Sequence, residues 1–332
     1  MKIQDRIYGE IEIEDPVILE LIGSRPFQRL KRVNQYGGVD LVFPGRYQVT
    51  RFEHSVGVWY ILKTVGANRE VQIAGLLHDL GHTAFSHMVD MALASSGEDF
   101  HEKNIGLIDG LDEVTRILKA NRIELKDADD YPEIKKSLPD VGADRIDYGV
   151  RDYVGATNLR HELGRKVISS IKLEGRDIVF TDIEVAREYA LTGLEAMWLC
   201  IYEPSVACVY QALTEIIREG VKSKWIKEKD LFKDDATLFE VIKNHRGSLP
   251  ETHYKIFTDP FTVREVGEAD SDFKHIKLKV RYFDPSVRLP DGLKRLSAVD
   301  GEFREKLEPM KRKFEERKKG KFFKVIFKSS VK

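Results

Sequence analysis

Two histidines and two aspartates in the first half of the chain suit a divalent metal ion: His54, the adjacent pair His78 and Asp79, and Asp144. The adjacent pair lies in an otherwise apolar run, which predicts burial. A buried charge without a partner either costs several kcal/mol or shifts its pKa until it is neutral, and a bound cation offsets that cost. Two imidazoles and two carboxylates favour Fe, Mn, Zn, Co or Ni, on which a bound water has a lowered pKa. We therefore expect a metal site that activates water, with Mg²⁺ as a further ion on substrate phosphates.

A second group of histidines follows in the sequence. Five of the nine histidines fall within residues 54–101, and packing alone does not explain that density, although a single histidine on an apolar face is usually a core residue. His87 and Asp90 are three residues apart, so a helix would let the carboxylate orient the imidazole as a general acid. His82 precedes this pair. His101 is less specific, because it could equally begin a helix without any chemical role.

Cationic and aromatic residues accompany the predicted ligands. Arg51 lies three residues before His54, and Arg145 directly follows Asp144. A guanidinium beside a metal suits a phosphate oxygen, although a surface ion pair is an equally good interpretation of each arginine alone. Tyr148 lies one helical turn beyond Asp144.

Composition bounds the class of protein. The chain has 332 residues, 42% of them hydrophobic and 33% charged, and a formal net charge of −1. This charge gives no general attraction to nucleic acid or membranes, so nucleic-acid binding is possible but not indicated. Cys200 and Cys208 are expected to be reduced core thiols. The sequence shows neither an apolar run of about 20 residues nor a signal-peptide pattern, so we expect a cytoplasmic protein without a membrane segment.

Apolar periodicity predicts a mainly α fold, with a helical core over residues 1–219 and an α+β region over residues 220–332. The candidate site occupies residues 50–155, and a β-hairpin insert is expected near 167–181, with its turn at residues 174–177. A first hairpin is expected over residues 3–13. The remaining expected helices are two between 16 and 33, broken near Gly23, and others over 51–66, 71–80, 85–94, 102–119, 144–153, 183–217 with a break at Pro204, and 302–319. Further strands are expected at 276–283 and 322–327.

The order of these residues resembles the HD-domain phosphohydrolases, whose signature is H…HD…D. Several surrounding blocks are similar to one branch, the dNTP triphosphohydrolases typified by the sterile-alpha-motif and HD-domain restriction factor. These blocks are residues 27–30, 35–38, 42–45, 51–55, 78–82, 85–87 and 144–148. The resemblance is good over residues 1–155, thin to about residue 215 and weak beyond.

The resemblance implies a role for each matching residue. His54, His78, Asp79 and Asp144 would bind the metal. His87 would be the general acid oriented by Asp90, with His82 and His101 on phosphates. The substrate contacts would be Arg51, Arg145, Tyr148, Asp152 and Tyr202, with Gln35 and Tyr36 at the sugar edge. The implied reaction is attack of water on the α-phosphorus of a dNTP, giving a deoxynucleoside and triphosphate, in a homo-oligomer that is a dimer or tetramer.

Three features of the sequence depart from the branch. The arginine expected on the terminal phosphate is replaced by Leu194, and the expected Tyr-x-His-Lys run reads Tyr202-Glu203-Pro204-Ser205. Loss of such a charge-assisted bond is worth about 1.5–3 kcal/mol. Gly23 stands where regulated members carry an aspartate that reads guanine, which argues against control by a guanine nucleotide.

Two alternatives remain open. The first is a phosphatase of the same class that acts on nucleoside monophosphates or another phosphoester, and the missing arginine favours it. The second is a nucleotide- or nucleic-acid-binding protein with a structural metal. The pair His87 and Asp90 disfavours this second alternative, because a structural metal site does not need a general acid.

Overall fold

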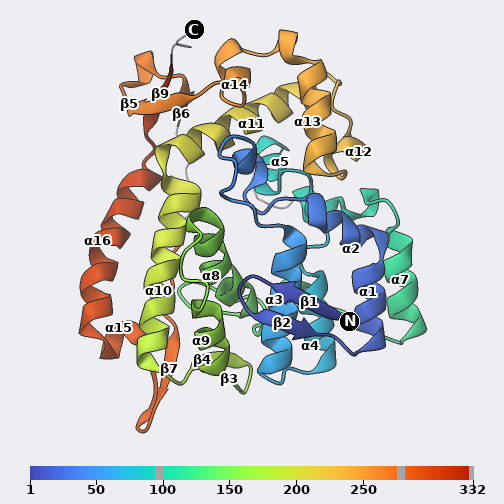
Figure 1. Cartoon of the computed structure of the whole chain (residues 1–332), viewed down its shortest axis with the longest axis vertical. Helices are drawn as coiled ribbons and strands as arrows, with labels where there is room; N and C mark the ends of the chain where they lie inside the picture. Colours follow the sequence, from blue (N-terminus) through green and yellow to red (C-terminus); the bar gives the residue numbers. More distant parts are fainter. Residues whose placement is uncertain (94–99, 275–280, 329–332) are drawn as a thin grey trace.

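The computed structural model describes residues 1–93, 100–274 and 281–328. These residues form a mainly helical fold with small sheets, which confirms the predicted fold class (Figure 1). Three helices lie at the centre of the site-bearing part, where α3 (Arg51–Thr64) packs against both α4 (Arg69–Leu77) and α8 (Ala143–Thr157).

The other helices surround this centre or extend from it. They are α1 (Pro16–Gly23), α2 (Arg25–Arg29), α5 (His87–Leu93), α6 (Phe100–Lys103), α7 (Leu111–Ala120), α9 (Leu163–Ser169), α10 (Ile183–Met197), α11 (Pro204–Lys222), α12 (Glu228–Leu231), α13 (Asp235–Asn244), α14 (Glu251–Lys255), α15 (Leu296–Val299) and α16 (Gly301–Lys318). A π-helical turn, Trp198–Tyr202, joins α10 to α11.

Three sheets accompany the helices in the described part of the chain. The first is the antiparallel hairpin of β1 (Lys2–Asp5) and β2 (Gly9–Glu12), with Asp5 opposite Gly9. The second has the order β3 (Ile171–Glu174), β4 (Asp177–Phe180), β7 (Ser286–Leu289) and β8 (Gly292–Arg295), and the third β5 (Phe261–Glu265), β9 (Phe322–Phe327) and β6 (Phe273–Lys274). Because β7 pairs in parallel with β4 and α16 packs on α10, residues after 280 return to the helical core.

The start of α3 is fixed by a capping box. The Thr50 hydroxyl accepts from the backbone N–H of Glu53, and the Glu53 carboxylate accepts from the backbone N–H of Thr50. These two bonds satisfy donors that a helix N-terminus leaves open. The first turn of α3, which carries Arg51 and His54, therefore has a fixed backbone. Since α3 is buried on nearly all sides, its polar side chains need partners within the protein.

Most expected elements are confirmed. The two hairpins, the pair of helices divided near Gly23 and the break before Pro204 all agree with the sequence. The single helix expected over 102–119 is wrong: the chain forms α6, a 3₁₀ turn at Ile105–Leu107 and then α7, which starts after Gly110 in a left-handed conformation, φ +80°. The strand expected at 276–283 lies mostly outside the described residues, and its described part, 281–283, is not a strand.

The structure also bears on the two cysteines and on membrane-spanning segments. Cys200 and Cys208 are both buried and free, in agreement with reduced core thiols. Within the described residues, none of the helices combines the length and the apolar character that crossing a membrane requires.

The helices α3 and α8 pack closely at Gly57. A Cβ atom on Gly57 would lie 2.0 Å from Oδ1 of Asp147 and 2.5 Å from a guanidinium nitrogen of Arg151, both on α8. Distances this short exclude any side chain at Gly57 unless the side chains of Asp147 and Arg151, or the helices, are displaced. Glycine at this position therefore lets α8 place Asp147 and Arg151 directly against α3.

We predict that Gly57→Ala destabilises the protein by about 1–3 kcal/mol, since an extra methyl group in a packed interface forces displacement. The measurement is the midpoint of thermal unfolding. Gly23→Ala is the matched control, because a Cβ on Gly23 would meet no atom within 4 Å. Equal midpoints for the two variants would contradict the prediction.

Candidate functional site

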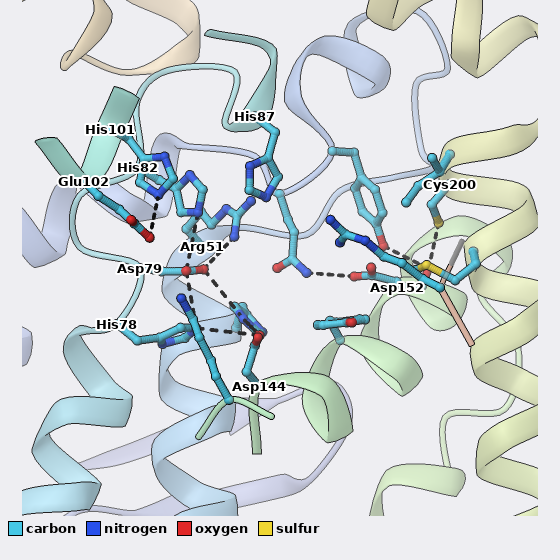
Figure 2. Close-up of a pocket in the computed structure, with 18 of the residues that line it drawn as sticks. Arg51, His78, Asp79, His82, His87, His101, Glu102, Asp144, Asp152 and Cys200 are labelled. Atoms are coloured by element: carbon cyan, nitrogen blue, oxygen red, sulfur yellow. Dashed lines mark hydrogen bonds and ion pairs between the residues drawn. The ribbon is translucent and has the colours of Figure 1, made fainter. Parts of the chain in front are cut away.

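The predicted metal ligands line one cleft of about 450 Å³. His54 comes from the first turn of α3, His78 and Asp79 directly follow α4, and Asp144 lies in the first turn of α8. Figure 2 shows the side chains of His78, Asp79 and Asp144 turned toward a common region. The central helices thus bring together residues that are up to 90 positions apart in the chain.

The spacing of the ligand atoms suits a single ion. Nε2 of His54 lies 3.1 Å from Oδ1 of Asp144 and 3.6 Å from Oδ2 of Asp79. Nε2 of His78 lies 3.3 Å from Oδ1 of Asp79 and 3.7 Å from Oδ1 of Asp144. Ligands bound to one ion at about 2.0–2.2 Å stand about 3–3.5 Å apart. His54, His78 and Asp144 therefore form a group that could hold one ion, and Asp79 lies beside it with one oxygen near each histidine.

The electrostatics of these residues also fit a cation. Nδ1 of His78 is 2.8 Å from the carbonyl of Gly75, whereas its buried Nε2 has no hydrogen-bond partner among the described residues, as a neutral metal ligand requires. Burial opposes ionisation of Asp144, but its contact with His54 holds the pKa of that carboxyl well below the usual range. Burial lowers the pKa of His54, but hydrogen bonds to Asp144 and Asp147 outweigh it and raise the pKa to about 10. The lowered pKa of Asp144 and the raised pKa of His54 both mean that the space between these side chains stabilises a positive charge.

Asp147 holds the outer side of His54. Its Oδ2 lies 2.7 Å from Nδ1 of His54, and because the carboxyl is ionised, Nδ1 carries the proton and Nε2 is left to face the ligands. Burial raises the pKa of Asp147, but the charge of Arg151 outweighs it and lowers the pKa. Arg151 donates to both oxygens of Asp147, at 2.7 and 2.9 Å, and Tyr8 donates to Oδ1 at 2.9 Å. Asp147 therefore fixes the orientation of the His54 ring and leaves Nε2 as the atom that would bind a metal.

Three further histidines gather beside the ligands. The rings of His82 and His101 stack with centroids 4.1 Å apart, and His87 meets His82 edge-on at 4.8 Å. Nε2 of His82 lies 3.4 Å from Oδ1 of Asp79, which connects this group to the metal ligands. The side chain of His87 is 39% exposed, against 3% for His82 and 9% for His101. His87 is thus the histidine of the three that faces open space.

Asp90 joins two of these histidines. Its oxygens lie 2.8 and 2.9 Å from Nδ1 of His101, and Oδ2 is also 3.3 Å from Nδ1 of His87. Burial raises the pKa of Asp90, but hydrogen bonds with His101 and then His87 hold it far below its usual range. His82, His87 and Asp90 are close enough to hold a second metal ion. Since His101 already occupies both oxygens of Asp90, the group is better suited to proton transfer and to contacts with phosphate oxygens.

Arg51 connects the ligands to the histidine group. Its guanidinium donates to Oδ2 of Asp79 at 2.6 Å and to the hydroxyl of Ser86 at 3.1 Å. Burial and then the charge of Arg51 hold the pKa of His82 well below its ordinary value, so His82 is neutral near pH 7. The expected phosphate-binding arginine therefore lines the cleft but also supports Asp79.

The other side of the cleft carries the residues expected at a sugar. The amide of Gln35 donates to Oδ1 of Asp152 at 2.9 Å, and the hydroxyl of Tyr36 donates to the backbone carbonyl of Asp152 at 2.9 Å. Burial raises the pKa of Asp152 to about 7. Figure 2 shows Asp152 and Cys200 to the right of Asp79 and Asp144, and His82 and His101 above Asp79 and His78. Tyr148 also lines the cleft, as do the larger apolar or aromatic side chains Met197, Ile201 and Tyr210.

Arg145 and Tyr202 are two expected substrate contacts that the structure does not bring to this lining. The guanidinium of Arg145 donates to the carbonyls of Lys136 and Asp140, at 2.6 and 2.5 Å, and lines a neighbouring depression. Tyr202 is buried, with its ring 4.7 Å from that of Phe314 on α16. Leu194 lines a separate groove between α10 and α16.

Two cations in the cleft were missed by the sequence analysis. Lys135 and Arg281 both line it, together with Glu102 and Asp129. Nζ of Lys135 lies 3.3 Å from Asp129. Lys135 sits in the irregular segment before α8, nine residues ahead of Asp144, and no local pattern marks it as part of the site. Arg281 reaches the cleft from the region after residue 220, where the resemblance is weak.

A helical fold that presents H, HD and D ligands from three adjacent helices defines an HD-type metal site, and comparison with known proteins agrees. The sequence profile of the HD domain matches residues 51–148. The chain is 33% identical to the uncharacterized protein YdhJ of Bacillus subtilis, over 98% of this chain and 99% of that protein. It is 32% identical to the metal-dependent phosphohydrolase cns2 of Cordyceps militaris, over 86% of this chain and 84% of that protein. The chain belongs to the HD-domain metal-dependent phosphohydrolases.

The resemblance to the dNTP triphosphohydrolases covers a smaller part of the chain than the matches to YdhJ and cns2. The deoxynucleoside triphosphate triphosphohydrolase SAMHD1 of Danio rerio is 45% identical over 101 residues, which is 26% of this chain and 16% of that protein. A crystal structure of a phosphohydrolase from Bacteroides thetaiotaomicron has the same fold, with a TM-score of 0.69 at 17% identity over 98% of this chain and 99% of that one. The HD phosphohydrolase class is thus confirmed, whereas these matches do not establish a dNTP substrate.

We predict that Asp79→Ala loses both the bound metal and phosphohydrolase activity, because it removes a ligand and leaves Arg51 as an unpaired buried charge. His87→Ala is the matched control within the same cleft: it should keep the metal and lose rate, typically by about 10²–10⁴-fold for a general acid. Metal content by elemental analysis and turnover of the same samples are the measurements. Turnover by metal-free Asp79→Ala protein would rule out this site as the metal centre.

Proposed function

We propose that this phosphohydrolase cleaves dNTPs to a deoxynucleoside and triphosphate. The observation that supports this most is that the cleft with the metal ligands is lined by two unlike groups of residues. Imidazoles and Lys135 suit phosphate oxygens, whereas Asp152, with Gln35 and Tyr36 bonded to it, suits a sugar. A substrate with its α-phosphorus at the metal would meet both groups.

Different groups around the cleft would activate the water, protonate the leaving group and bind the phosphate. A divalent cation held by the four ligands would lower the pKa of water to give a nucleophile at neutral pH and would offset charge on the phosphoryl oxygens. His87, with Nδ1 directed at Asp90 and its side chain exposed, would give a proton to the leaving 5′-oxygen. His82, neutral and buried, would donate a hydrogen bond to a phosphate oxygen without carrying a charge.

The residues around Asp152 offer groups for a deoxyribose. Asp152, with a pKa raised to about 7, and the amide of Gln35 can exchange hydrogen bonds with a 3′-hydroxyl. The ring of Tyr36 is almost fully buried and fixed by its bond to the Asp152 carbonyl, so it leaves little room at the sugar edge. Steric exclusion of a 2′-hydroxyl by Tyr36 would favour deoxynucleotides over ribonucleotides.

Lys135 is the residue we assign to the outer phosphates. Relatives in the dNTP branch carry an arginine where this chain has Leu194, and Leu194 lies outside the cleft. Lys135 lies within it, and burial lowers its pKa but the charges of Asp144, Asp79 and other carboxylates outweigh this and raise it. A lysine that stays charged beside the metal ligands is a suitable phosphate partner.

A monophosphate substrate is the second candidate. Glu102 and Asp129 line the cleft close to Lys135, and their carboxylates would repel a β- or γ-phosphate. Mg²⁺ bound with the outer phosphates would remove that repulsion, so the second candidate gains most if dNTPs are not turned over even when Mg²⁺ is added. Whether the chain forms the expected homo-oligomer stays a prediction.

Product analysis separates the two candidates. Purified protein is supplied with Mn, Co, Ni, Fe or Mg and with dATP, dGTP, ATP or dAMP, and the products are resolved by chromatography. Release of triphosphate from dATP or dGTP supports the dNTP reaction, and orthophosphate from dAMP supports the monophosphate reaction. Inactivity with every metal and nucleotide would overturn both.

We predict that Lys135→Ala lowers kcat/KM for dATP by about 10- to 100-fold, the equivalent of losing one charge-assisted bond of about 1.5–3 kcal/mol. Turnover of dAMP should change little, because dAMP has no outer phosphate. Lys136→Ala is the matched control, since Lys136 pairs with Asp177 and does not line the cleft. An equal loss for dATP and dAMP would mean that Lys135 does not bind the outer phosphates.

A further inference from the structure

We propose that Asp235, at the start of α13, is a positioning residue that fixes two segments of the cleft relative to each other. The first segment leads to His87 and the second carries Gln35 and Tyr36, and we call them the first and the second wall. Oδ1 of its carboxylate accepts from the backbone N–H of Phe85 at 2.8 Å, and Oδ2 accepts from the backbone N–H of Asn34 at 2.8 Å. Phe85 lies two residues before His87, and Asn34 directly precedes Gln35. A single carboxylate therefore joins the segment of the proposed acid to the segment of the proposed sugar contacts.

The segment that Asp235 holds on the first wall is strained. Phe85 and Ser86 have φ values of +58° and +49°, a left-handed conformation that residues with a Cβ adopt only when surrounding contacts impose it. The amide of Phe85 donates to Asp235, and that of the preceding Ala84 donates to the carbonyl of Leu231 at 2.8 Å. One restraint comes from the last residue of α12 and the other from the first residue of α13. This turn determines where α5 begins and thus where His87 points.

The second wall is tied to the first through the same residues. The hydroxyl of Ser86 donates to the carbonyl of Asn34 at 2.6 Å, and the side-chain oxygen of Asn34 accepts from the amide of Tyr36 at 2.8 Å. With its N–H on Asp235, Asn34 is held through its amide, its carbonyl and its side chain. Displacing Asp235 would therefore affect Tyr36 as well as His87.

A third set of hydrogen bonds, made by Arg29, lies beside Asp235 and supports the same interpretation. Arg29 donates to the carbonyl of Lys233 at 3.2 Å and to the carbonyls of Leu80 and His82 at 3.0 and 2.8 Å. Leu80 directly follows the metal ligand Asp79. Figure 1 shows α12 and α13 beside α5, in agreement with these bonds. The segment from Leu231 to Asp235 thus bonds to the backbone of Asn34, Ala84 and Phe85, and Arg29 connects it to the carbonyls of Leu80 and His82.

Asp235 gives the region after residue 220 an indirect role in the reaction. This role rests on the proposed acid function of His87, but it does not depend on which phosphoester is the substrate. Asp235 touches no reacting group in this arrangement. Its effect on rate would pass through His87 and, to a smaller extent, through Gln35 and Tyr36.

Asp235→Asn tests the proposal, because the amide keeps the size of the carboxylate but leaves one of the two N–H groups without an acceptor. In the metal-loaded protein we expect faster hydrogen–deuterium exchange at residues 33–37 and 83–88. We also expect kcat for dATP, or for dAMP if that is the substrate, to fall on the order of 10- to 100-fold. Metal content should not change.

A double-mutant cycle separates positioning from general destabilisation. In a His87→Ala background, Asp235→Asn should cause little further loss of kcat, because the group it positions is already absent. A full, multiplicative loss in that background would overturn the proposal. Asp234→Asn is the matched control: Asp234 caps α13 and pairs with Arg32, so its change should leave kcat and exchange at both segments unaltered.

The two hypotheses fail in different ways. If no nucleotide is turned over, the proposed function fails, and the exchange measurement alone decides whether Asp235 holds the two segments. If a nucleotide is turned over but exchange and kcat are the same in Asp235→Asn and in the unaltered protein, the positioning role fails and the proposed function stands.

Discussion

The contact on which the site depends is the bond between the Asp147 carboxylate and Nδ1 of His54, buried between α3 and α8. A carboxylate in such a place is costly unless charged partners and hydrogen bonds compensate it. Arg151 supplies the charge, Tyr8 a further hydrogen bond, and Gly57 the space that lets α8 come close enough. Arg151 also donates to Asp5, so the N-terminal hairpin is joined to the same network. The position of a metal ligand on α3 thus follows from residues on three separate elements.

The sequence predicted the parts of the site that are encoded locally. His54, His78, Asp79 and Asp144 stand at or near helix ends, where spacing and burial patterns are readable, and they converge as expected. The spacing of His87 and Asp90 was also informative, but the stronger contact of Asp90, with His101, joins residues 11 positions apart that local spacing does not relate. Lys135 and Arg281 lie outside the helices and strands, and only tertiary packing brings them to the cleft. Asp235 begins α13, and no local pattern predicts its bonds to Asn34 and Phe85. The helix expected over 102–119 was wrong for a local reason, because Gly106 and Gly110 outweigh the apolar pattern.

Leu194 shows that the role of a residue in related proteins does not transfer to this chain when the packing around that position accounts for a different residue. In this chain the position faces α16, where Leu191, Pro309 and Met310 line the same groove. An apolar residue there agrees with its surroundings, so its presence reflects the packing of the region after residue 280 on α10. Lys135 lines the cleft from a different segment, the one before α8. If Lys135 binds the outer phosphates as proposed, a change in the partner of one helix has moved a binding contact to another segment while the H, HD and D residues keep their places.

The contacts of the N-terminal hairpin bear on how the site assembles during synthesis. Tyr8 and Asp5 meet Asp147 and Arg151 across 139 and 146 residues of sequence. Contacts between such distant residues form late, because a long loop must close before they contribute. A growing chain would present His54, His78 and Asp79 well before α8 emerges from the ribosome. Until then these three ligands form an incomplete set with weaker metal affinity, so acquisition of the ion and completion of the helical core are expected to be one coupled event.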